Sequence, residues 1–209
     1  MITRLTRFFL IIGTGLLLLD GALLVTGRSS APQFPAGAVI STGVAAIGGP
    51  FVLSRSDGTT VTDATFRGKW MLIYFGYTHC PDVCPAVLAN IGIVLNALQK
   101  DADTLQPLFI TFDPERDLAS VLSDYMRSFD PRIVALTGTT VQTDAAAKAY
   151  RVVVEPHGEQ GLDQLIDHSS YLYLMDPAGT FVDIIPGSAS GAEMAARVRS
   201  LMRNHSTPS

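Results

Sequence analysis

Two cysteines four residues apart carry the most explicit chemistry of this sequence. Cys80 and Cys84 lie in the segment YFGYTHCPDVCP, where an apolar run, Trp70–Gly76, gives way to a predicted helix. Because proline suits the first position of a helix and disfavours helical geometry in the residue before it, Pro85 predicts that Cys84 lies at or near the N-cap. The positive end of a helix lowers the pKa of a thiol and favours the thiolate, which binds metal ions and attacks disulfides.

Cys80 is predicted to lie in the loop before this helix, so its distance to Cys84 can adjust. Within a regular helix, Cβ atoms four residues apart are ~5–6 Å from each other, whereas a disulfide prefers ~3.8 Å. The loop relieves this mismatch, and the pair could therefore either chelate a metal ion or close a disulfide. The alternative of two buried cysteines that act as small core side chains is disfavoured by the flanking prolines, Pro81 and Pro85.

A structural zinc site is a poor match to this segment, because such sites use four tightly spaced cysteine or histidine ligands. The one further candidate in the segment is His79, which is the direct neighbour of Cys80. Its side chain is expected to point away from the pair. A third ligand therefore has to come from a distant part of the chain.

The elements that must position the cysteines follow the order strand, helix, strand, helix, with a terminal hairpin and helix. A βαβ half joined to a ββα half gives an α/β fold, a central mixed sheet with helices on both faces. This order is the thioredoxin-like plan, with an extra N-terminal β-hairpin and an inserted helix. Strands are expected at Trp70–Gly76, Leu108–Phe112, Ile133–Leu136, Val152–Val154, Tyr171–Met175 and Thr180–Ile185, helices at Pro85–Lys100, Leu118–Phe129, Thr140–Arg151 and Ala192–Arg203, the hairpin within Phe51–Val61, and a surface loop at Pro156–Asp167.

A candidate third ligand follows from this plan. In thioredoxins the loop before the first strand of the terminal hairpin lies against the cysteine loop and carries a cis-proline. Here that place reads Asp167-His168-Ser169-Ser170, with no proline. An imidazole beside two thiolates makes a Cys₂His site, a ligand set that suits copper better than hard cations. His168 is therefore the predicted third ligand, with Asp167 or a backbone carbonyl as the group that orients its ring.

The first residues of the chain predict a membrane segment. Arg4 and Arg7 precede an apolar stretch that ends at Val25 and is interrupted at Asp20. Its length of about 18 residues approaches the ~20 that a helix needs to cross a membrane. A signal-anchor with cytoplasmic arginines is favoured over a cleaved signal peptide, because no Ala-x-Ala-like site follows. The expected organisation is an anchor at 1–28, a tether at 29–50 and a thioredoxin-like copper-binding domain at 51–205.

Composition limits the functional classes. The chain has 209 residues, of which 16% are charged, and its formal net charge is −4. Because phosphate binding requires a basic stripe, nucleic acid is not an expected partner. The absence of a long presequence rich in arginine and serine indicates a bacterial inner-membrane protein whose functional domain lies in the periplasm.

Four stretches together resemble the SCO/SenC family of copper proteins, which assemble cytochrome c oxidase. The resemblance covers roughly residues 48–203. It implies a thioredoxin-like fold, an N-terminal membrane anchor, and copper, as Cu(I) or Cu(II), bound by Cys80, Cys84 and His168. The matching stretches are Tyr74–Pro85 (YFGYTHCPDVCP), Leu108–Asp117 (LFITFDPERD), Leu136–Gly138 with Ala149–Arg151, and Asp167–Pro177 (DHSSYLYLMDP).

The function that this resemblance implies is that of a metallochaperone without catalytic turnover, which delivers copper to the binuclear CuA centre in subunit II of cytochrome c oxidase. Its further expected partners are a periplasmic copper donor and a thioredoxin-like reductant. The alternative is an enzyme, a thiol–disulfide oxidoreductase that uses Cys80 and Cys84 to keep the CuA cysteines reduced. Against the alternative stand the C-x-x-x-C spacing and a histidine where redox thioredoxins have proline.

Charged residues near the cysteines match the family in part. One family motif contains Asp113, Glu115, Arg116 and Asp117. A structural role for this motif, in a strand end, a turn and an ion pair, is favoured over direct contact with copper. Asp82 lies between the cysteines and either tunes the site or faces a partner.

Two departures from known patterns complete the comparison. Gln164 stands where the family often has tyrosine, which concerns the packing of the loop at 156–167 and not the ligand set. A peroxiredoxin function is excluded, because the pattern P-x-x-x-T-x-x-C meets Ile73 in place of proline and Tyr77 in place of threonine.

Overall fold

The computed structural model describes residues 47–157, 165–168 and 170–205. The predicted membrane anchor at 1–28 and nearly all of the predicted tether at 29–50 lie outside the described residues, and so does Gln164. These assignments therefore stay predictions.

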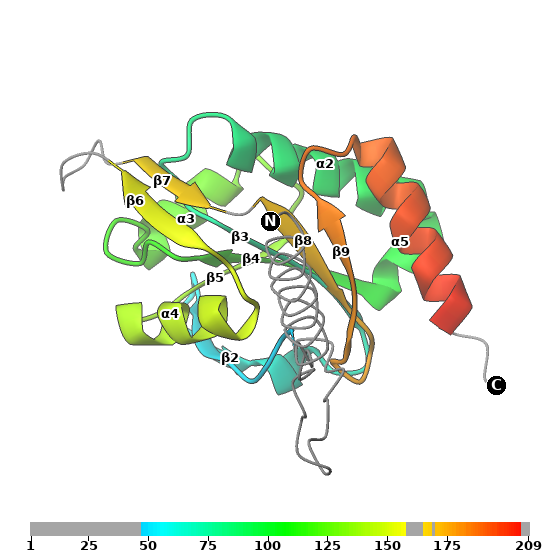
Figure 1. The fold of residues 1–209 in the computed structure, drawn as a ribbon, viewed down its shortest axis with the longest axis horizontal. Coiled ribbons are helices and arrows are strands. Elements are labelled where there is room, and N and C mark those ends of the chain that lie inside the picture. Colours follow the sequence, from blue (N-terminus) through cyan, green and yellow to red (C-terminus); the bar gives the residue numbers. More distant parts are fainter. Residues whose placement is uncertain (1–46, 158–164, 169, 206–209) are drawn as a thin grey trace, which may run out of the picture. The chain divides into compact units, whose positions relative to one another are not determined.

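A seven-stranded mixed sheet forms the centre of the fold (Figure 1). The strands β5, β4 and β3 run parallel, whereas β8 pairs antiparallel with β3 and β1 pairs antiparallel with β5. The predicted mixed sheet is confirmed, and the predicted N-terminal hairpin is the antiparallel pair β1–β2. The order across the sheet is β2 (Thr60–Thr62), β1 (Val52–Arg55), β5 (Val134–Thr137), β4 (Leu105–Thr111), β3 (Trp70–Gly76), β8 (Tyr171–Met175) and β9 (Phe181–Pro186).

Helices cover both faces of this sheet, as predicted. Alternate side chains of β3 show the division, because Tyr74 stacks on Phe109, which contacts Tyr125 of α3, whereas Phe75 packs on Tyr150 at the end of α4. Helices α2 and α5 lie side by side on the Tyr74 face (Figure 1). The helices are α2 (Val83–Leu98), α3 (Ala119–Met126), α4 (Thr140–Ala149) and α5 (Gly191–His205), with 3₁₀ helices η1 (Asp63–Phe66) and η2 (Gln99–Thr104).

The core is built around β3 and α2. Every residue of β3 is buried, as the unbroken apolar run predicts for a strand covered on both faces. Helix α2 buries Cys84 and a row of aliphatic side chains that includes Ile91 and Leu95. Among the described residues, one helical stretch, Val83–Thr104, is long and apolar enough to cross a membrane by length and composition alone. Its contacts with the core and with α5 are those of a core helix.

The helix after the cysteines begins two residues earlier than predicted. Its first residue is Val83, so that Cys84 is the second helical residue and Pro85 the third. Proline is tolerated there because the first four N–H groups of a helix have no acceptor within the helix. The prediction that Cys84 lies near the amino end of the helix is nevertheless correct.

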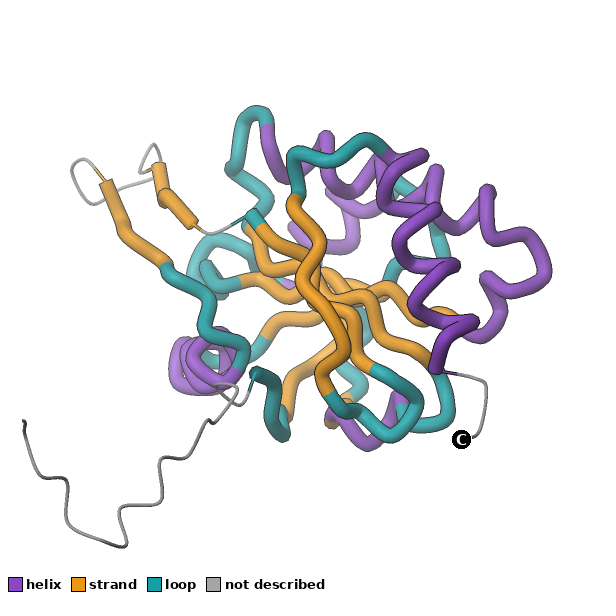
Figure 2. Tube along the Cα trace, turned by 45° about the vertical axis from the view of Figure 1, so that its right-hand side comes forward, coloured by secondary structure: helices purple, strands orange, loops and turns teal. Residues whose placement is uncertain are grey.

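The segment Pro156–Asp167, predicted to be a surface loop, contains parts of two strands. Strands β6 (Val154–His157) and β7 (Leu165–His168) pair antiparallel in a ribbon separate from the main sheet (Figure 2). Polar residues and glycines favoured a loop, but Val154 and Ile166 pack against the core and stabilise extended chain at the base of the ribbon. The residues between the two strands, 158–164, lie outside the described part.

Candidate metal centre

Both cysteines lie just beyond the carboxyl end of β3. Cys80 is in the loop after the strand and is partly exposed, whereas Cys84, in the first turn of α2, is fully buried. Neither forms a disulfide. The loop turns tightly, since the N–H of Cys80 donates to the carbonyl oxygen of Tyr77 at 3.4 Å. The pair is therefore a dithiol with one sulfur accessible and one enclosed.

Each sulfur accepts a hydrogen bond from a donor held by the fold. The N–H of Cys84 donates to Cys80 Sγ at 3.3 Å, and the hydroxyl of Tyr74 donates to Cys84 Sγ at 3.4 Å. The first donor is one of the N–H groups at the amino end of α2 that have no acceptor within the helix. Hydrogen bonds donated to sulfur favour the thiolate, the form in which cysteine binds metal ions.

The pKa of Cys84 lies well above its usual range. The largest cause is the hydrogen bond between Cys84 and Cys80, and burial of the thiol is the next, whereas the hydroxyl of Tyr74 acts in the opposite direction. The prediction that the helix end lowers the pKa is therefore wrong for Cys84, because the hydrogen bond with the Cys80 side chain and the burial of the thiol raise this pKa. A metal ion that binds Cys84 has to displace the thiol proton.

Gly76 allows β3 to approach Cys84 closely. A Cβ atom on this residue would lie 2.9 Å from Cys84 Sγ and 2.7 Å from an edge carbon of the Phe109 ring. Both distances are shorter than normal van der Waals contacts. Glycine at the end of this strand is therefore required for the observed position of the buried sulfur.

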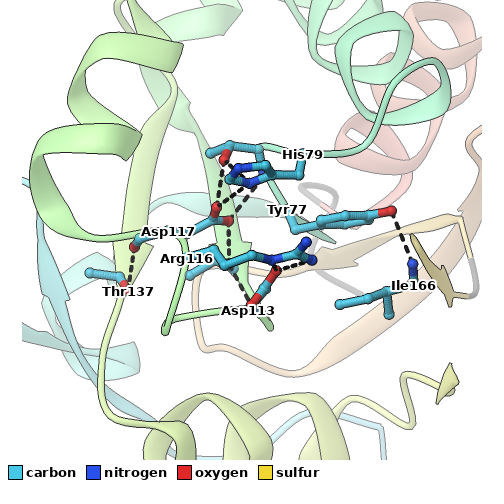
Figure 3. A network of polar contacts seen from close by, with 9 residues as sticks. Tyr77, His79, Asp113, Arg116, Asp117, Thr137 and Ile166 are labelled. Atoms are coloured by element: carbon cyan, nitrogen blue, oxygen red, sulfur yellow. Dashed lines mark hydrogen bonds and ion pairs between the residues drawn. The ribbon is translucent and has the colours of Figure 1, made fainter. Parts of the chain in front are cut away.

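A buried carboxylate holds the cysteine loop on the sheet. Asp117 accepts hydrogen bonds from the N–H of Thr78 at 3.0 Å, the hydroxyl of Thr78 at 2.5 Å and the hydroxyl of Thr111 at 2.7 Å (Figure 3). The carbonyl oxygen of Asp117 accepts a further bond from the Thr137 hydroxyl at 3.2 Å. Because Thr78 is two residues before Cys80, this network fixes the start of the loop.

A second set of contacts ties β7 to the same loop. The guanidinium of Arg116 pairs with Asp113 at 2.5 Å and lies over the ring of Tyr77, 5.7 Å from its centroid. The hydroxyl of Tyr77 accepts a hydrogen bond from the N–H of Ile166 at 3.1 Å (Figure 3). The expected structural role of the Asp113–Asp117 motif thus has a concrete form, a turn and an ion pair that support the cysteine loop and the ribbon.

His168 is the last residue of β7, and its backbone pairs with Val154. Ile166, two residues earlier, is bonded to Tyr77, which is three residues before Cys80, so the fold brings the end of β7 towards the cysteine loop. The imidazole of His168 lies outside the described part of the structure. Among the side chains that are described, no group of three or more His, Cys, Asp or Glu residues is close enough to hold a metal ion. The assignment of His168 as third ligand stays a prediction.

The other polar residues of the loop have different surroundings. His79 is exposed, and its Nδ1 atom lies 3.1 Å from the Thr78 hydroxyl and 3.7 Å from Asp117 Oδ1. Its ring is thus engaged with the Asp117 network. Asp82 is exposed and precedes α2 as the N-cap residue, but its side chain makes no capping hydrogen bond. Its carboxylate is therefore open to solvent or to a partner.

Sequence reasoning missed the two tyrosines that contact the site. The apolar run Trp70–Gly76 includes Tyr74, and the motif YFGYTHCPDVCP includes Tyr77, but neither pattern assigns a hydrogen-bond partner to these hydroxyls. A signal for them was present, because a tyrosine inside a fully buried run needs a hydrogen-bond partner for its hydroxyl. The identity of those partners, Cys84 and Ile166, depends on chain segments that are distant in sequence.

The fold and the site define a thioredoxin-like domain with a C-x-x-x-C dithiol at the carboxyl edge of its sheet. The model of the family SCO1/SenC matches residues 40–203 of this chain. The chain belongs to the SCO1/SenC family, and the membership predicted from the sequence motifs is confirmed.

Several relatives are clearly similar. The mitochondrial protein SCO1 of Saccharomyces cerevisiae is 47% identical over 146 residues, which cover 68% of this chain and 50% of the relative. The solved structure of Bradyrhizobium japonicum ScoI with copper bound has a TM-score of 0.69 and 42% identity, and the match covers 75% of this chain and 99% of that one. The structure of yeast Sco1 with copper bound has a TM-score of 0.70 and 42% identity, covering 76% of this chain and 89% of that one.

These comparisons confirm the fold and show that homologous proteins bind copper. The chain spans about half the length of the curated relatives it matches. A more distant structural relative, BsSco, is a member of the Sco family of cytochrome c oxidase assembly proteins, and at 22% identity it supports the fold alone.

The different surroundings of the two sulfurs predict different reactivities. In the reduced protein we expect iodoacetamide to modify Cys80 at least about tenfold faster than Cys84, because Cys84 is enclosed and its pKa is raised. Peptide mass spectrometry after timed exposure measures both rates. Protein unfolded in urea is the control, in which the two rates should converge. Equal rates in the folded protein would contradict the enclosed position of Cys84.

The Asp117 network predicts a loop that depends on one carboxylate. In Asp117→Asn, an NH₂ group replaces an acceptor oxygen opposite the threonine donors, and we expect a loss of about 2–3 kcal/mol in the free energy of unfolding. Hydrogen exchange at the Thr78 amide should become faster as well. Asp82→Asn changes an exposed carboxylate of the same loop and should alter stability by less than about 0.5 kcal/mol. Unchanged exchange at Thr78 in Asp117→Asn would refute the role given to this carboxylate.

Proposed function

We propose that this protein is a membrane-anchored copper metallochaperone that delivers copper to the CuA site in subunit II of cytochrome c oxidase. Cys80, Cys84 and His168 are the proposed ligands. The observation that carries the proposal is the reduced dithiol of Cys80 and Cys84 in a fold that brings the end of β7 towards it. Membership of a family with copper-bound relatives supports copper as the cargo.

The chemistry of the available donors fits copper. Thiolates and an imidazole are soft and borderline ligands, which bind copper better than hard cations such as magnesium or calcium. The carboxylates nearest the loop are already engaged, Asp117 with threonine donors and Asp113 with Arg116. Sulfur is therefore the dominant donor that the described part of the site offers to a metal ion.

The proposed cellular arrangement follows the sequence. Residues 1–28 anchor the chain in the bacterial inner membrane, residues 29–50 act as a tether, and the thioredoxin-like domain at 51–205 lies in the periplasm. The tether lets the copper site reach an oxidase in the same membrane. A thioredoxin-like reductant is a further proposed partner, because the cysteines must be reduced before they bind copper, and a periplasmic copper donor is the proposed source of the metal.

Copper titration of the reduced domain tests the ligand set. We expect Cys80→Ala, Cys84→Ala and His168→Ala each to weaken Cu(I) affinity at least about tenfold, since metal affinity depends on every ligand of such a site. His79→Ala removes a histidine of the same loop that is engaged with Asp117, and it is the matched control, with an affinity expected to equal that of the unmodified domain. Wild-type affinity in the double variant Cys80→Ala/Cys84→Ala would refute the copper site.

A thiol–disulfide oxidoreductase is the second candidate, and the partly exposed thiol of Cys80 beside Cys84 favours it. In that reaction Cys80 and Cys84 are oxidised to a disulfide while a disulfide between the two CuA cysteines is reduced to two thiols. Two electrons and two protons pass from this protein to the partner, and the thioredoxin-like reductant restores the dithiol.

His168→Ala separates the two functions, because it removes a proposed copper ligand and leaves both thiols in place. For copper delivery, cells that carry this variant should lose oxidase activity and regain it when copper is added. Reduction of an oxidised CuA-domain peptide by the purified variant should remain at the wild-type rate. Full oxidase activity in His168→Ala cells without added copper would contradict delivery through this site and favour the thiol reaction.

A further inference from the structure

A tyrosine in the middle of the sheet donates its hydroxyl to one of the two site sulfurs. Tyr74 is fully buried in β3, and its hydroxyl lies 3.4 Å from Cys84 Sγ. A buried hydroxyl without a partner costs about 1–3 kcal/mol relative to a satisfied one. Phenylalanine would fill the same space in the core, so packing does not explain the hydroxyl of Tyr74. We therefore look for its role in the chemistry of the cysteines.

The ring of Tyr74 is held rigidly. Its backbone pairs with Phe109 of β4 on one side and with Leu172 of β8 on the other. The ring stacks on that of Phe109, with centroids 6.1 Å apart and planes inclined by 26°. The hydroxyl is thus fixed by the central strands, whereas the sulfur belongs to a side chain in the first turn of α2. The tyrosine positions the sulfur, and not the reverse.

A side-chain hydroxyl donates to the sulfur of Cys84. Cys80 accepts from the backbone N–H of Cys84, a donor that every amino acid except proline supplies at that position. Cys84 accepts from the hydroxyl of Tyr74 in addition to a backbone hydrogen bond from Tyr77, so part of its environment depends on the identity of residue 74. A hydroxyl that donates to sulfur draws electron density from it and stabilises the reduced form relative to a disulfide sulfur, which is a weaker acceptor.

We propose that Tyr74 is a positioning residue that fixes Cys84 Sγ and holds the Cys80–Cys84 pair in its reduced, metal-binding form. This inference deepens the proposed function, since the pair is the same one that would bind copper or exchange disulfides. In the absence of Tyr74's hydroxyl the fold remains, but the pair is oxidised more readily.

The test is the equilibrium of the metal-free domain with glutathione. Two protein thiols are oxidised to a disulfide while one glutathione disulfide is reduced to two glutathione molecules, so electrons and protons balance. In Tyr74→Phe we expect the equilibrium constant for protein oxidation to rise about two- to tenfold, which corresponds to the loss of one hydrogen bond to the reduced state. Acid quenching, thiol alkylation and mass spectrometry measure the oxidised fraction at each glutathione ratio.

Two other tyrosines supply matched controls. Tyr150 is buried on the opposite face of the sheet among Phe75 and Tyr173, so Tyr150→Phe removes a core hydroxyl that does not contact a cysteine. Tyr125 is on the Tyr74 face, and its buried hydroxyl makes no hydrogen bond within the described residues. Neither control should shift the equilibrium as far as Tyr74→Phe does. An unchanged constant in Tyr74→Phe, or an equal shift in both controls, would overturn the inference.

A second measurement does not depend on a redox couple. If the hydrogen bond is the cause, Tyr74→Phe should lower the free energy of unfolding less in a Cys84→Ala background than in the wild-type background. Identical losses in the two backgrounds would refute the coupling. Both experiments use protein without metal, so they succeed or fail independently of the copper titration that tests the proposed function.

Discussion

The burial of one carboxylate at the edge of the sheet constrains the rest of the site. A charged group removed from water costs several kcal/mol unless donors replace the water that it loses. Asp117 meets this requirement with three hydrogen bonds, two from Thr78 in the cysteine loop and one from Thr111 at the end of β4. Thr137 of β5 adds a bond to its carbonyl oxygen. Because the buried carboxylate cannot bind water instead, the cysteine loop has to stay where Thr78 can donate to it. This requirement also fixes the approximate position of Cys80, two residues after Thr78.

The turn that contains Asp117 also holds the separate β6–β7 ribbon in place. Asp117 ends the turn that begins at Asp113, and within that turn Arg116 is directed at Asp113 and over the ring of Tyr77. The hydroxyl of Tyr77 then holds the N–H of Ile166 in β7. A turn after one parallel strand thereby supports two segments that are far apart in the chain, the cysteine loop and the strand that ends at His168. The hydrogen bonds and the ion pair of this turn thus account for the acidic and basic motif next to the cysteine loop.

The elements that depend on local pattern could be predicted from the sequence, and those that depend on distant partners could not. The apolar run Trp70–Gly76 is a strand with the predicted bounds, since continuous apolar residues leave little alternative in a buried sheet. The start of α2 was misplaced because proline is allowed at several positions of a first turn. The hydrogen bond between Tyr77 and Ile166 joins residues 89 positions apart, and no local sequence pattern predicts it. The prediction of a lowered pKa for Cys84 was wrong for the same reason, because the hydrogen bond with Cys80 and the burial of the thiol outweigh the effect of the helix end.

The arrangement of the sulfurs also bears on how a cargo metal is handed over under the proposed function. Cys84 is enclosed, fixed by a helix and held by a strand tyrosine, whereas Cys80 is partly exposed on a loop. A partner that approaches from solvent therefore meets Cys80 before Cys84. Transfer by ligand exchange needs one protein ligand to yield while another still holds the metal, since loss of all ligands at once would release it to solvent. A rigid inner sulfur and an accessible outer sulfur divide these tasks between two residues. Two cysteines with equal exposure would not give this order of contact with a partner. The sulfurs differ in exposure because Cys80 lies in the loop before α2, whereas Cys84 lies in the buried first turn of the helix.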